Sequence, residues 1–417
     1  SKFDLAKLNL TFPRQRKSGS KPPRLWKKRR KSNQMPHSKS QLTWRLAGFY
    51  GVYFILIGFV SAFWPLWLKD RGISETEIGI ILASGVFAKV FVSPTIAHLA
   101  DRRGERKGLM IVLAFCAAAV FSVFQFAEGF WSILLVTALF FMAWSSILPL
   151  GESLTMLNAK AKGLDYGRLR LWGSIGFIVA TAGGGIFLTD RSVDTVHWLI
   201  LGSAVAVFAI CWLLPNTKVE KSEQGKAPFM TMLTNGRFVL FIAACALIQS
   251  THAIYYGFAT IHWKNVGYNE TVIGALWAEG VVAEIILFIY GTQLIARLGA
   301  ARLILLGGLA AVIRWTVTGL SDDLSVLIVV QALHAFTFGA THLGAIHYIS
   351  ETVAPERSAT AQSLYAVAVS GVAMAMGLAT SGKLYAMFSG GAYLVMAGVG
   401  VAGVILAFNL DIKSKRD

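Results

Sequence analysis

A few ionisable side chains of this sequence lie inside long apolar stretches, where water cannot solvate them. Lys89, Glu284 and Arg314 are the clearest cases. An ionisable group near the centre of a bilayer costs roughly 2.5 to 3.5 kcal/mol on insertion scales, so each one needs a partner or a task. Glu284 and Arg314 fall at similar expected depths in neighbouring segments, where the guanidinium would hold the carboxylate ionised until a ligand or a rearrangement separates them. This arrangement suits a proton carrier, and a purely structural salt bridge is the alternative.

Two further charges support the same interpretation. Lys89 is a natural counter-charge for a carboxylate ligand, although it could instead pair with an acid of its own protein. Glu152, a second candidate for proton coupling, lies close enough along the chain to Arg168 and Arg170 to pair with either.

Polar and aromatic side chains also recur at helical spacing, which places them on one face of a helix. The two stripes are His334, Phe338 and His342, and Gln249, His252 and Tyr256. Aromatic rings combined with hydrogen-bonding groups suit an aromatic ligand that has a polar end. Packing histidines and hydrogen bonds between helices are the alternative reading.

The elements that position these residues are long apolar helices. Of the 417 residues 55% are hydrophobic and only 15% charged, against roughly a quarter charged in soluble domains. The apolar runs are long enough to cross a bilayer, and lipid cannot satisfy open backbone groups, so the spans must be helices. We predict an all-α membrane protein with about twelve spans: 44–67, 77–99, 108–126, 131–157, 171–188, 196–214, 239–260, 272–294, 303–320, 324–349, 361–385 and 393–408.

The positive charge is concentrated before the first span. The net charge is +17, and residues 1–40 hold thirteen Lys and Arg against the single acid Asp4, which leaves +5 for the rest. We expect a disordered tail here. It is either a cytoplasmic extension, a misplaced start with Met35 as the first native residue, or, less in keeping with the rest, a transit peptide. Contact of the basic tail with anionic lipid is a further reading.

Loop charges predict the orientation. The loops after even-numbered spans hold fifteen Lys and Arg, and those after odd-numbered spans hold about five. By the positive-inside rule, both termini should be cytoplasmic.

The chain is expected to divide into two six-helix halves. The polar segment 215–236 separates 41–214 from 237–410, with tails at 1–40 and 411–417. Two similar stretches, ADRRGERKGLM (100–110) and ARLGAARLIL (296–305), contain Gly104 and Gly299, which lie 195 residues apart. Repeated halves around a site at the bilayer midplane are typical of transporters.

The loop between the second and third spans carries a recognisable motif. The sequence HLADRRGERK, residues 98–107, resembles the signature loop of the major facilitator superfamily. Its glycine permits a tight turn, and its charges can hold two helices together in one gating state. A plain surface charge run is the alternative. The matching residues are Asp101, Arg102, Gly104, Arg106 and Lys107.

A narrower resemblance covers most of the membrane region. The stretches LDYGRLRLWGSIGF (164–177), HAIYYGFATIHW (252–263), GVVAEIILF (280–288), VIRW (312–315) and QALHAFTFGATHL (331–343) resemble the 3-phenylpropionate permease family, in a branch similar to lactose permeases and nucleoside/proton symporters. That resemblance implies a bacterial inner-membrane symporter that carries small molecules and protons without cofactor or obligate protein partner. The lactose permease family has a carboxylate with its helix-10 histidine, whereas here no carboxylate precedes Glu351 in that helix.

We therefore expect a proton-coupled symporter of a small aromatic carboxylate, working by alternating access, with Glu284 as proton carrier and Lys89 or Arg314 as carboxylate ligand. The rivals are a nucleoside or sugar symporter, an exporter, a non-transporting sensor and a lipid enzyme. An enzyme has no support, because the sequence has no HExxH, GxSxG or Walker A pattern, and Cys116, Cys211 and Cys245 show no metal-binding spacing. The GxGxxG match at 398–403 lies within an apolar span and indicates helix packing rather than a dinucleotide site.

Overall fold

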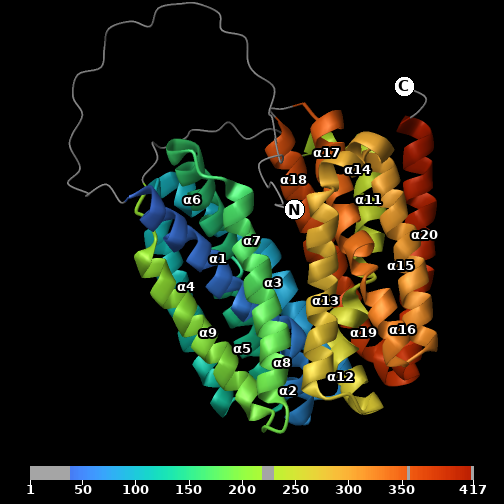
Figure 1. Ribbon diagram of the computed structural model, residues 1–417, viewed down its shortest axis with the longest axis horizontal. Coiled ribbons are helices and arrows are strands. Elements are labelled where there is room, and N and C mark those ends of the chain that lie inside the picture. The colour runs from blue at the N-terminus through green and yellow to red at the C-terminus, as the bar shows by residue number, and fades with distance from the viewer. Residues whose placement is uncertain (1–37, 218–229, 355–356, 415–417) are drawn as a thin grey trace, which may run out of the picture. The chain divides into compact units, whose positions relative to one another are not determined.

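The computed structural model describes residues 38–217, 230–354 and 357–414, and over these residues the chain is entirely helical (Figure 1). Met35 and the predicted basic tail up to residue 37 lie outside the described residues, as do residues 218–229 of the predicted linker. The last helix continues to Ser414, well into the segment 411–417 that we expected to be a tail.

We call the elements of residues 38–217 the N-terminal helices. They are α1 (Lys39–Ala62), α2 (Trp64–Asp70), α3 (Glu75–Arg103), α4 (Lys107–Ser122), η2 (Val123–Phe126), α5 (Gly129–Trp144), α6 (Ile147–Lys162), α7 (Tyr166–Ile178), η3 (Val179–Gly183), α8 (Gly184–Leu188) and α9 (Asp194–Leu213).

We call the elements of residues 230–414 the C-terminal helices. They are α10 (Met230–Leu233), α11 (Gly236–Ser250), α12 (Ala253–Val266), α13 (Glu270–Ile289), α14 (Gly291–Leu298), α15 (Ala300–Leu320), α16 (Leu324–Gln331), η4 (Ala335–Ala340), α17 (Thr341–Thr352), α18 (Ser358–Tyr365), η6 (Ala366–Ala373), α19 (Met374–Phe388), η7 (Ser389–Gly391) and α20 (Ala392–Ser414).

Eleven helical stretches of the described residues are long and apolar enough to cross a membrane. The last of them, Thr360–Asp411, has 52 residues and would measure about 78 Å as a straight helix, far more than a hydrocarbon core of about 30 Å. The short turn η7 interrupts it, and Ser389 there has a positive φ of 50°. The predicted count of twelve spans stays a prediction.

Exposed tryptophans mark both ends of the helices. Trp44 and Trp212 are 63% and 58% exposed near one end, and Trp131 and Trp198 are 77% and 58% exposed near the other. Tryptophan is enriched where a membrane protein meets the lipid headgroups. These positions fit a chain whose helices run from one membrane face to the other.

A repeat of 195 residues relates the two sets of helices. Within it, a Lys–Gly–Glu–Gly pattern recurs: Lys69, Gly72, Glu75 and Gly79 in the first copy, and Lys264, Gly267, Glu270 and Gly274 in the second. In each copy the lysine pairs with the glutamate, at 2.6 Å and 2.5 Å, across a turn whose glycine has positive φ. The repeat thus preserves local structure as well as sequence.

The two sets of helices pack tightly at one end, which we call the Gly72 end; the opposite end is the Gly104 end (lower and upper parts of Figure 1). A Cβ on Gly79 would lie 2.6 Å from the carbonyl oxygen of Leu378, and one on Gly382 would overlap the backbone of Glu75. Because small residues let helix backbones approach closely, α3 and α19 contact each other directly here.

The repeat supplies a second contact of the same kind. A Cβ on Gly274 of α13 would overlap the carbonyl oxygen of Thr181, and one on Gly185 would overlap that of Glu270. The hydroxyls of Thr189 and Thr271 also form a hydrogen bond of 2.9 Å. The Gly72 end is therefore closed by two glycine-lined helix contacts.

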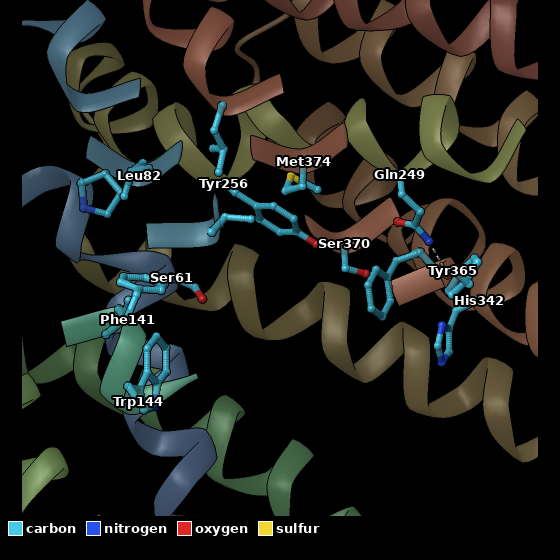
Figure 2. A pocket seen from close by; sticks show the side chains of 15 residues that line it. Ser61, Leu82, Phe141, Trp144, Gln249, Tyr256, His342, Tyr365, Ser370 and Met374 are labelled. Atoms are coloured by element: carbon cyan, nitrogen blue, oxygen red, sulfur yellow. Dashed lines mark hydrogen bonds between the residues drawn. The ribbon is translucent and has the colours of Figure 1, made fainter. Parts of the chain in front are cut away.

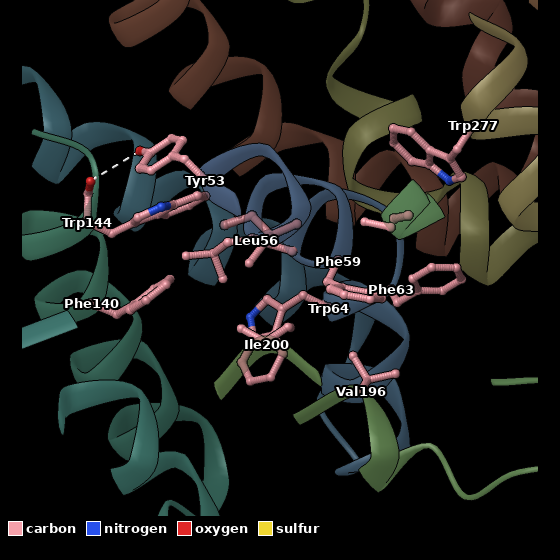
Figure 3. Close-up of a cluster of buried hydrophobic side chains, with 14 of the residues drawn as sticks. Tyr53, Leu56, Phe59, Phe63, Trp64, Phe140, Trp144, Val196, Ile200 and Trp277 are labelled. Carbon is pink, nitrogen blue, oxygen red and sulfur yellow. Dashed lines mark hydrogen bonds between the residues drawn. The ribbon is translucent and has the colours of Figure 1, made fainter. Parts of the chain in front are cut away.

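Aromatic side chains fill the interior of the N-terminal helices (Figure 3). Trp64 stacks on Trp67 with ring centroids 4.4 Å apart, and the Tyr53 hydroxyl donates a 3.2 Å hydrogen bond to the carbonyl oxygen of Trp144. The accepting carbonyl group belongs to the last residue of α5, where the helix is interrupted before α6.

The GxGxxG segment packs as expected, because Gly400 and Gly403 of α20 lie against Val312 and Ile248.

Candidate functional site

A cavity of about 340 Å³ lies between the N-terminal and C-terminal helices (Figure 2). Its volume is within the range of small-molecule sites, about 300–1,000 Å³. The lining residues from the N-terminal helices are Val60, Ser61, Pro65, Leu82, Val86, Phe141 and Trp144; those from the C-terminal helices are Gln249, Tyr256, Phe338, His342, Tyr365, Ser370, Met374 and Leu378.

Irregular helix segments shape this cavity. Helices are interrupted at Phe63, at Ser145 and at Thr251, next to lining residues of α1, α5 and α11. The π-helical segments η4 and η6 contain Phe338 and Ser370. Interrupted helices and π-bulges often occur at functional sites in membrane proteins, because backbone departing from the helix is tolerated where it faces a cavity.

Aromatic rings form the walls, and a few polar groups interrupt them. Phe141 and Trp144 face the cavity from one side, and Tyr256, Phe338 and Tyr365 from the other. The Gln249 side chain donates a hydrogen bond of 3.4 Å to the carbonyl oxygen of Phe338, leaving its own oxygen open. Such a site can bind a flat apolar group and orient it through a polar end.

Four of the residues predicted for ligand binding line this cavity: Gln249, Tyr256, Phe338 and His342. The predicted stripe of His334, Phe338 and His342 forms as its spacing indicated, since Phe338 stacks between the two histidines at centroid distances of 5.5 and 6.1 Å. Lys89, His252, Arg314 and His334, predicted for the same role, are not among the lining residues of this conformation.

Arg314 is completely buried behind the cavity. Its guanidinium donates hydrogen bonds to Gln331 Oε1 at 2.7 Å, His334 Nδ1 at 3.0 Å and Thr337 Oγ1 at 3.1 Å. It also lies over the rings of Tyr255 and Trp315, at 4.7 and 4.4 Å. Contacts with neutral acceptors and π faces hold this charge in place, so a ligand in the cavity does not reach it.

The predicted direct pair between Glu284 and Arg314 is wrong for this conformation. His334 lies between them, with Nε2 at 3.9 Å from Glu284 Oε2 while Nδ1 accepts from Arg314. Because Nδ1 accepts a hydrogen bond, the ring proton must reside on Nε2, the atom that faces Glu284. Arg314 thereby fixes the tautomer of the histidine that contacts the acid.

His252 belongs to the same buried network. It starts α12 directly after the helix break, and its Nδ1 donates to the carbonyl oxygen of Gln249 at 3.1 Å. Its Nε2 accepts from the Thr337 hydroxyl at 3.0 Å, which in turn accepts from Arg314. The break turns His252 away from the ligand side on which Gln249 and Tyr256 lie.

A second charged group lies within the N-terminal helices. Arg170 Nε is 3.7 Å from Glu152 Oε1, which confirms one of the two pairings expected for that acid. The guanidinium rests on the ring of Phe54 at 4.1 Å, in space left by the missing side chain of Gly173. Arg170 also interacts electrostatically with Glu284 and His342 of the C-terminal helices.

Lys89 occupies the midpoint of α3. It follows Leu82 and Val86 at intervals of seven and three residues, on the helix face that lines the cavity. The side chain is exposed, and it interacts electrostatically with Glu152. Three residues of this site are not evident from the sequence. Arg170 falls among the loop charges when Lys and Arg are counted between the spans, and Trp144 and Tyr365 carry no polar or charged signal inside an apolar span.

The signature loop forms a compact charge lattice at the Gly104 end. Gly104 adopts a φ of 63°, as a tight turn requires, and Arg106 bridges Asp101 at 2.9 Å and Ser153 Oγ at 2.7 Å. Lys107 donates to the carbonyl oxygen of Trp212 at 2.7 Å, and Arg102 is exposed. In this conformation the described loop contacts join α3 and α4 to α6 and α9, all within the N-terminal helices.

Removing the buried guanidinium should destabilise the fold. We expect Arg314→Met to cost about 3 kcal/mol, because Gln331, His334 and Thr337 lose a charged partner inside the protein. The melting temperature of the purified protein in detergent measures this loss. Arg297→Met, at an exposed arginine of α14, is the control and should leave it unchanged; equal melting curves for the two variants would contradict the network.

Comparison with known proteins gives a consistent result. The model of the MFS_1 like family matches residues 43–395. The chain is 31% identical over 376 residues to the probable 3-phenylpropionic acid transporter of Escherichia coli K12, covering 87% of this chain and 96% of that protein. It is 26% identical over 371 residues to the maltose permease of Geobacillus stearothermophilus, covering 86% and 92%.

Solved structures share the fold. A crystal structure of a variant of the nucleoside transporter NupG superimposes with a TM-score of 0.80 at 17% identity, covering 89% of this chain and 99% of the other. A bacterial homologue of the human lysosomal transporter Spinster, inward-facing and unoccupied, gives 0.66 at 16% identity, covering 89% and 96%. Family match, relatives and fold agree, and the chain belongs to the MFS_1-like family of the major facilitator superfamily, as a multi-pass membrane transporter rather than an enzyme.

Proposed function

We propose that this transporter takes up a small aromatic carboxylate, such as 3-phenylpropionate, together with protons. The observation that carries the proposal is the central cavity with its aromatic walls. Lys89 lies three residues beyond the lining residue Val86 on α3, and both Lys89 and Arg170 interact with Glu152. The named specificity of the relative from Escherichia coli points to the same cargo. A phenyl ring would lie between Trp144 and Tyr256, with the carboxylate directed toward Lys89.

The Gly104 end is proposed to face the cytoplasm of a bacterial cell, because the loops there hold most of the Lys and Arg. The glycine contacts then close the outer side, and the structure corresponds to an inward-facing conformation. Transport requires the N-terminal and C-terminal helices, 41–214 and 237–410, to rock about the cavity so that these contacts open and the Gly104 end closes. In that state the signature loop would meet a C-terminal helix.

Glu284 is proposed to carry the proton. Ionised, it compensates the charge of Arg314 through His334, and it attracts Arg170 of the other set of helices. Protonation removes this cross-attraction and leaves the site with one uncompensated positive charge, which the carboxylate of the cargo can balance. Glu152, paired with Arg170, is the second acid of this site.

Lys89 is proposed to bind the carboxylate of the cargo. A charge-assisted hydrogen bond is worth about 1.5 to 3 kcal/mol, so Lys89→Met should weaken 3-phenylpropionate binding by about 10- to 100-fold. Affinity for the uncharged 3-phenylpropanamide should stay the same. Quenching of tryptophan fluorescence in detergent measures both affinities, since Trp144 lines the cavity.

Two further variants make this measurement decisive. Lys89→Arg keeps the positive charge and should retain most of the affinity. Lys160→Met removes an exposed lysine at the end of α6 and should behave as wild type. If Lys89→Met binds acid and amide with their wild-type ratio, the carboxylate does not sit at Lys89.

A nucleoside or a sugar is the second candidate cargo, favoured by the likeness to the NupG fold and to maltose and raffinose permeases. A competition panel separates the two. Labelled 3-phenylpropionate uptake is measured in proteoliposomes against an excess of unlabelled cinnamate, uridine, maltose or raffinose. Only the aromatic acid should compete; inhibition by uridine or a sugar, with none by cinnamate, would replace the proposed cargo.

A further inference from the structure

Six charged side chains form a chain of alternating sign through the membrane-spanning helices. They connect the N-terminal and C-terminal helices beside the cavity. Ordered by their interactions, direct, through His334 or longer-range, they are Lys89, Glu152, Arg170, Glu284, Arg314 and Glu279. We call this set the charge ladder.

Direct geometry supports its central steps. Arg170 is 3.7 Å from Glu152, Glu284 is 3.9 Å from His334, and His334 accepts a 3.0 Å hydrogen bond from Arg314. Three steps are longer-range electrostatic interactions: Arg170 with Glu284, Lys89 with Glu152, and Glu279 with Arg314. The helices α7 and α13, which carry Arg170 and Glu284, pack against each other.

The charges of the ladder cancel. It contains three cations and three carboxylates. The two histidines of the Arg314 network, His334 and His252, are neutral, because each uses a ring nitrogen as an acceptor, and we take His342, which stacks on Phe338, as the neutral imidazole. His334 accepts from Arg314, and His252 accepts from Thr337. With all three carboxylates ionised and the cavity empty, the site carries no net charge.

The repeat places opposite charges at equivalent positions. Lys89 and Glu284 are 195 residues apart and each lies fourteen residues after the glutamate that begins its helix, Glu75 or Glu270. This one pair of equivalent positions thus holds a cation in the N-terminal helices and a carboxylate in the C-terminal helices. This balance fails as soon as one charge is added or removed.

We infer that the carrier moves one proton with one monovalent carboxylate, so that each transport cycle transfers no net charge. This inference rests on the proposed function. A proton on Glu284 alone gives the ladder a charge of +1, and the cargo anion alone gives −1. Only the empty carrier and the carrier with both ligands are neutral.

Neutrality decides which states can change conformation. Closing the Gly104 end encloses the cavity and removes water from it, and an uncompensated charge enclosed there is strongly disfavoured. The carrier with only the proton or only the cargo therefore cannot change conformation, while the empty carrier and the carrier with both ligands can. Coupling follows from the charge balance, and leak of either ligand alone is suppressed.

The groups around Glu284 can support this single protonation. His334 faces it from the residue before η4, Arg170 from α7, and Tyr256 from α12. Gly339 of η4 packs against its side chain. Among these described neighbours there is no second carboxylate with which a further proton would have to be shared.

Voltage dependence tests the inference. Proteoliposomes with wild-type protein take up labelled 3-phenylpropionate under a fixed pH gradient, while potassium and valinomycin set the membrane potential. An internal pH dye counts protons in the same vesicles, and protein-free liposomes correct for passive entry of the undissociated acid. The expected result is one proton per cargo molecule and an initial rate that does not change with voltage.

A cycle that moves net charge would give a different result. If one net charge moved per cycle, an inside-negative potential of about 118 mV would shift the accumulation ratio about a hundredfold. Such a shift, or a ratio of two protons, would overturn the inference while leaving the cargo and the proton coupling intact. Protein-dependent uptake that is absent altogether would instead contradict the proposed function itself.

Discussion

A Glu284→Gln variant should exchange 3-phenylpropionate across the membrane but fail to accumulate it. The amide mimics the protonated acid, so the loaded carrier stays neutral and can reorient, whereas the empty carrier keeps an uncompensated charge beside Arg314 and Arg170. Wild type should accumulate cargo about tenfold for each unit of pH gradient, because one unit is worth about 1.4 kcal/mol. The variant should reach a ratio near one.

Two assays in the same vesicles separate these steps. Counterflow, in which unlabelled cargo inside exchanges for labelled cargo outside, should remain close to wild type, and gradient-driven accumulation should be lost. Glu351→Gln, which neutralises an exposed acid at the end of α17, should be normal in both. Normal accumulation by Glu284→Gln would remove Glu284 as the proton carrier.

The second large effect concerns the closed Gly72 end. Leucine at Gly274 and Gly382 cannot fit against the carbonyl oxygens of Thr181 and Glu75. Overpacking costs about 1 to 3 kcal/mol per site, and about 5.5 kcal/mol inverts a 99:1 population, so the double variant should favour the state open at this end. Uptake should fall at least about tenfold, because the carrier cannot return to the inward-facing state.

Accessibility of the cavity reports the change. A single cysteine replacing Ser61, a lining residue, is introduced after Cys116, Cys211 and Cys245 have been substituted. A membrane-impermeant maleimide added outside should label it faster in the double variant. Gly202→Leu serves as control, since a Cβ there meets no neighbour within 4 Å; equal labelling in all three proteins would show that these contacts do not form the outer closure.

The helices and the two polar-aromatic stripes of the cavity wall could be predicted because they follow from composition and period. Long apolar runs can only be helices in lipid, and the four-residue spacing of His334, Phe338 and His342 places their rings in one stack. The pairing of Glu152 with Arg170 could also be predicted, because the two residues lie on consecutive helices joined by a short loop.

The partner of Arg314 could not be predicted in this way. Periodicity gives the depth of a residue in its span, but it does not give the rotation of that helix about its axis. In the structure the helices are rotated so that His334 lies between Arg314 and Glu284. The position of His252 depends on the helix break after Thr251, and no proline or glycine announces that break in the sequence.

Arg170 illustrates a different limit. It lies only one turn after the start of α7, so a count of charges assigns it to the loop. The open space above Gly173 and the ring of Phe54 instead direct its guanidinium toward Glu152. The contact with Phe54 of α1 comes from a helix distant in sequence, and it leaves no local pattern along the chain.

The most direct test of the central claim is the initial rate of labelled 3-phenylpropionate uptake into proteoliposomes, measured with and without an imposed inward proton gradient and corrected with protein-free liposomes. The account predicts protein-dependent uptake that rises with the gradient and collapses when a proton ionophore is added. Uptake that is the same with and without the gradient, or no protein-dependent uptake at all, would contradict a proton-coupled carrier of aromatic carboxylates.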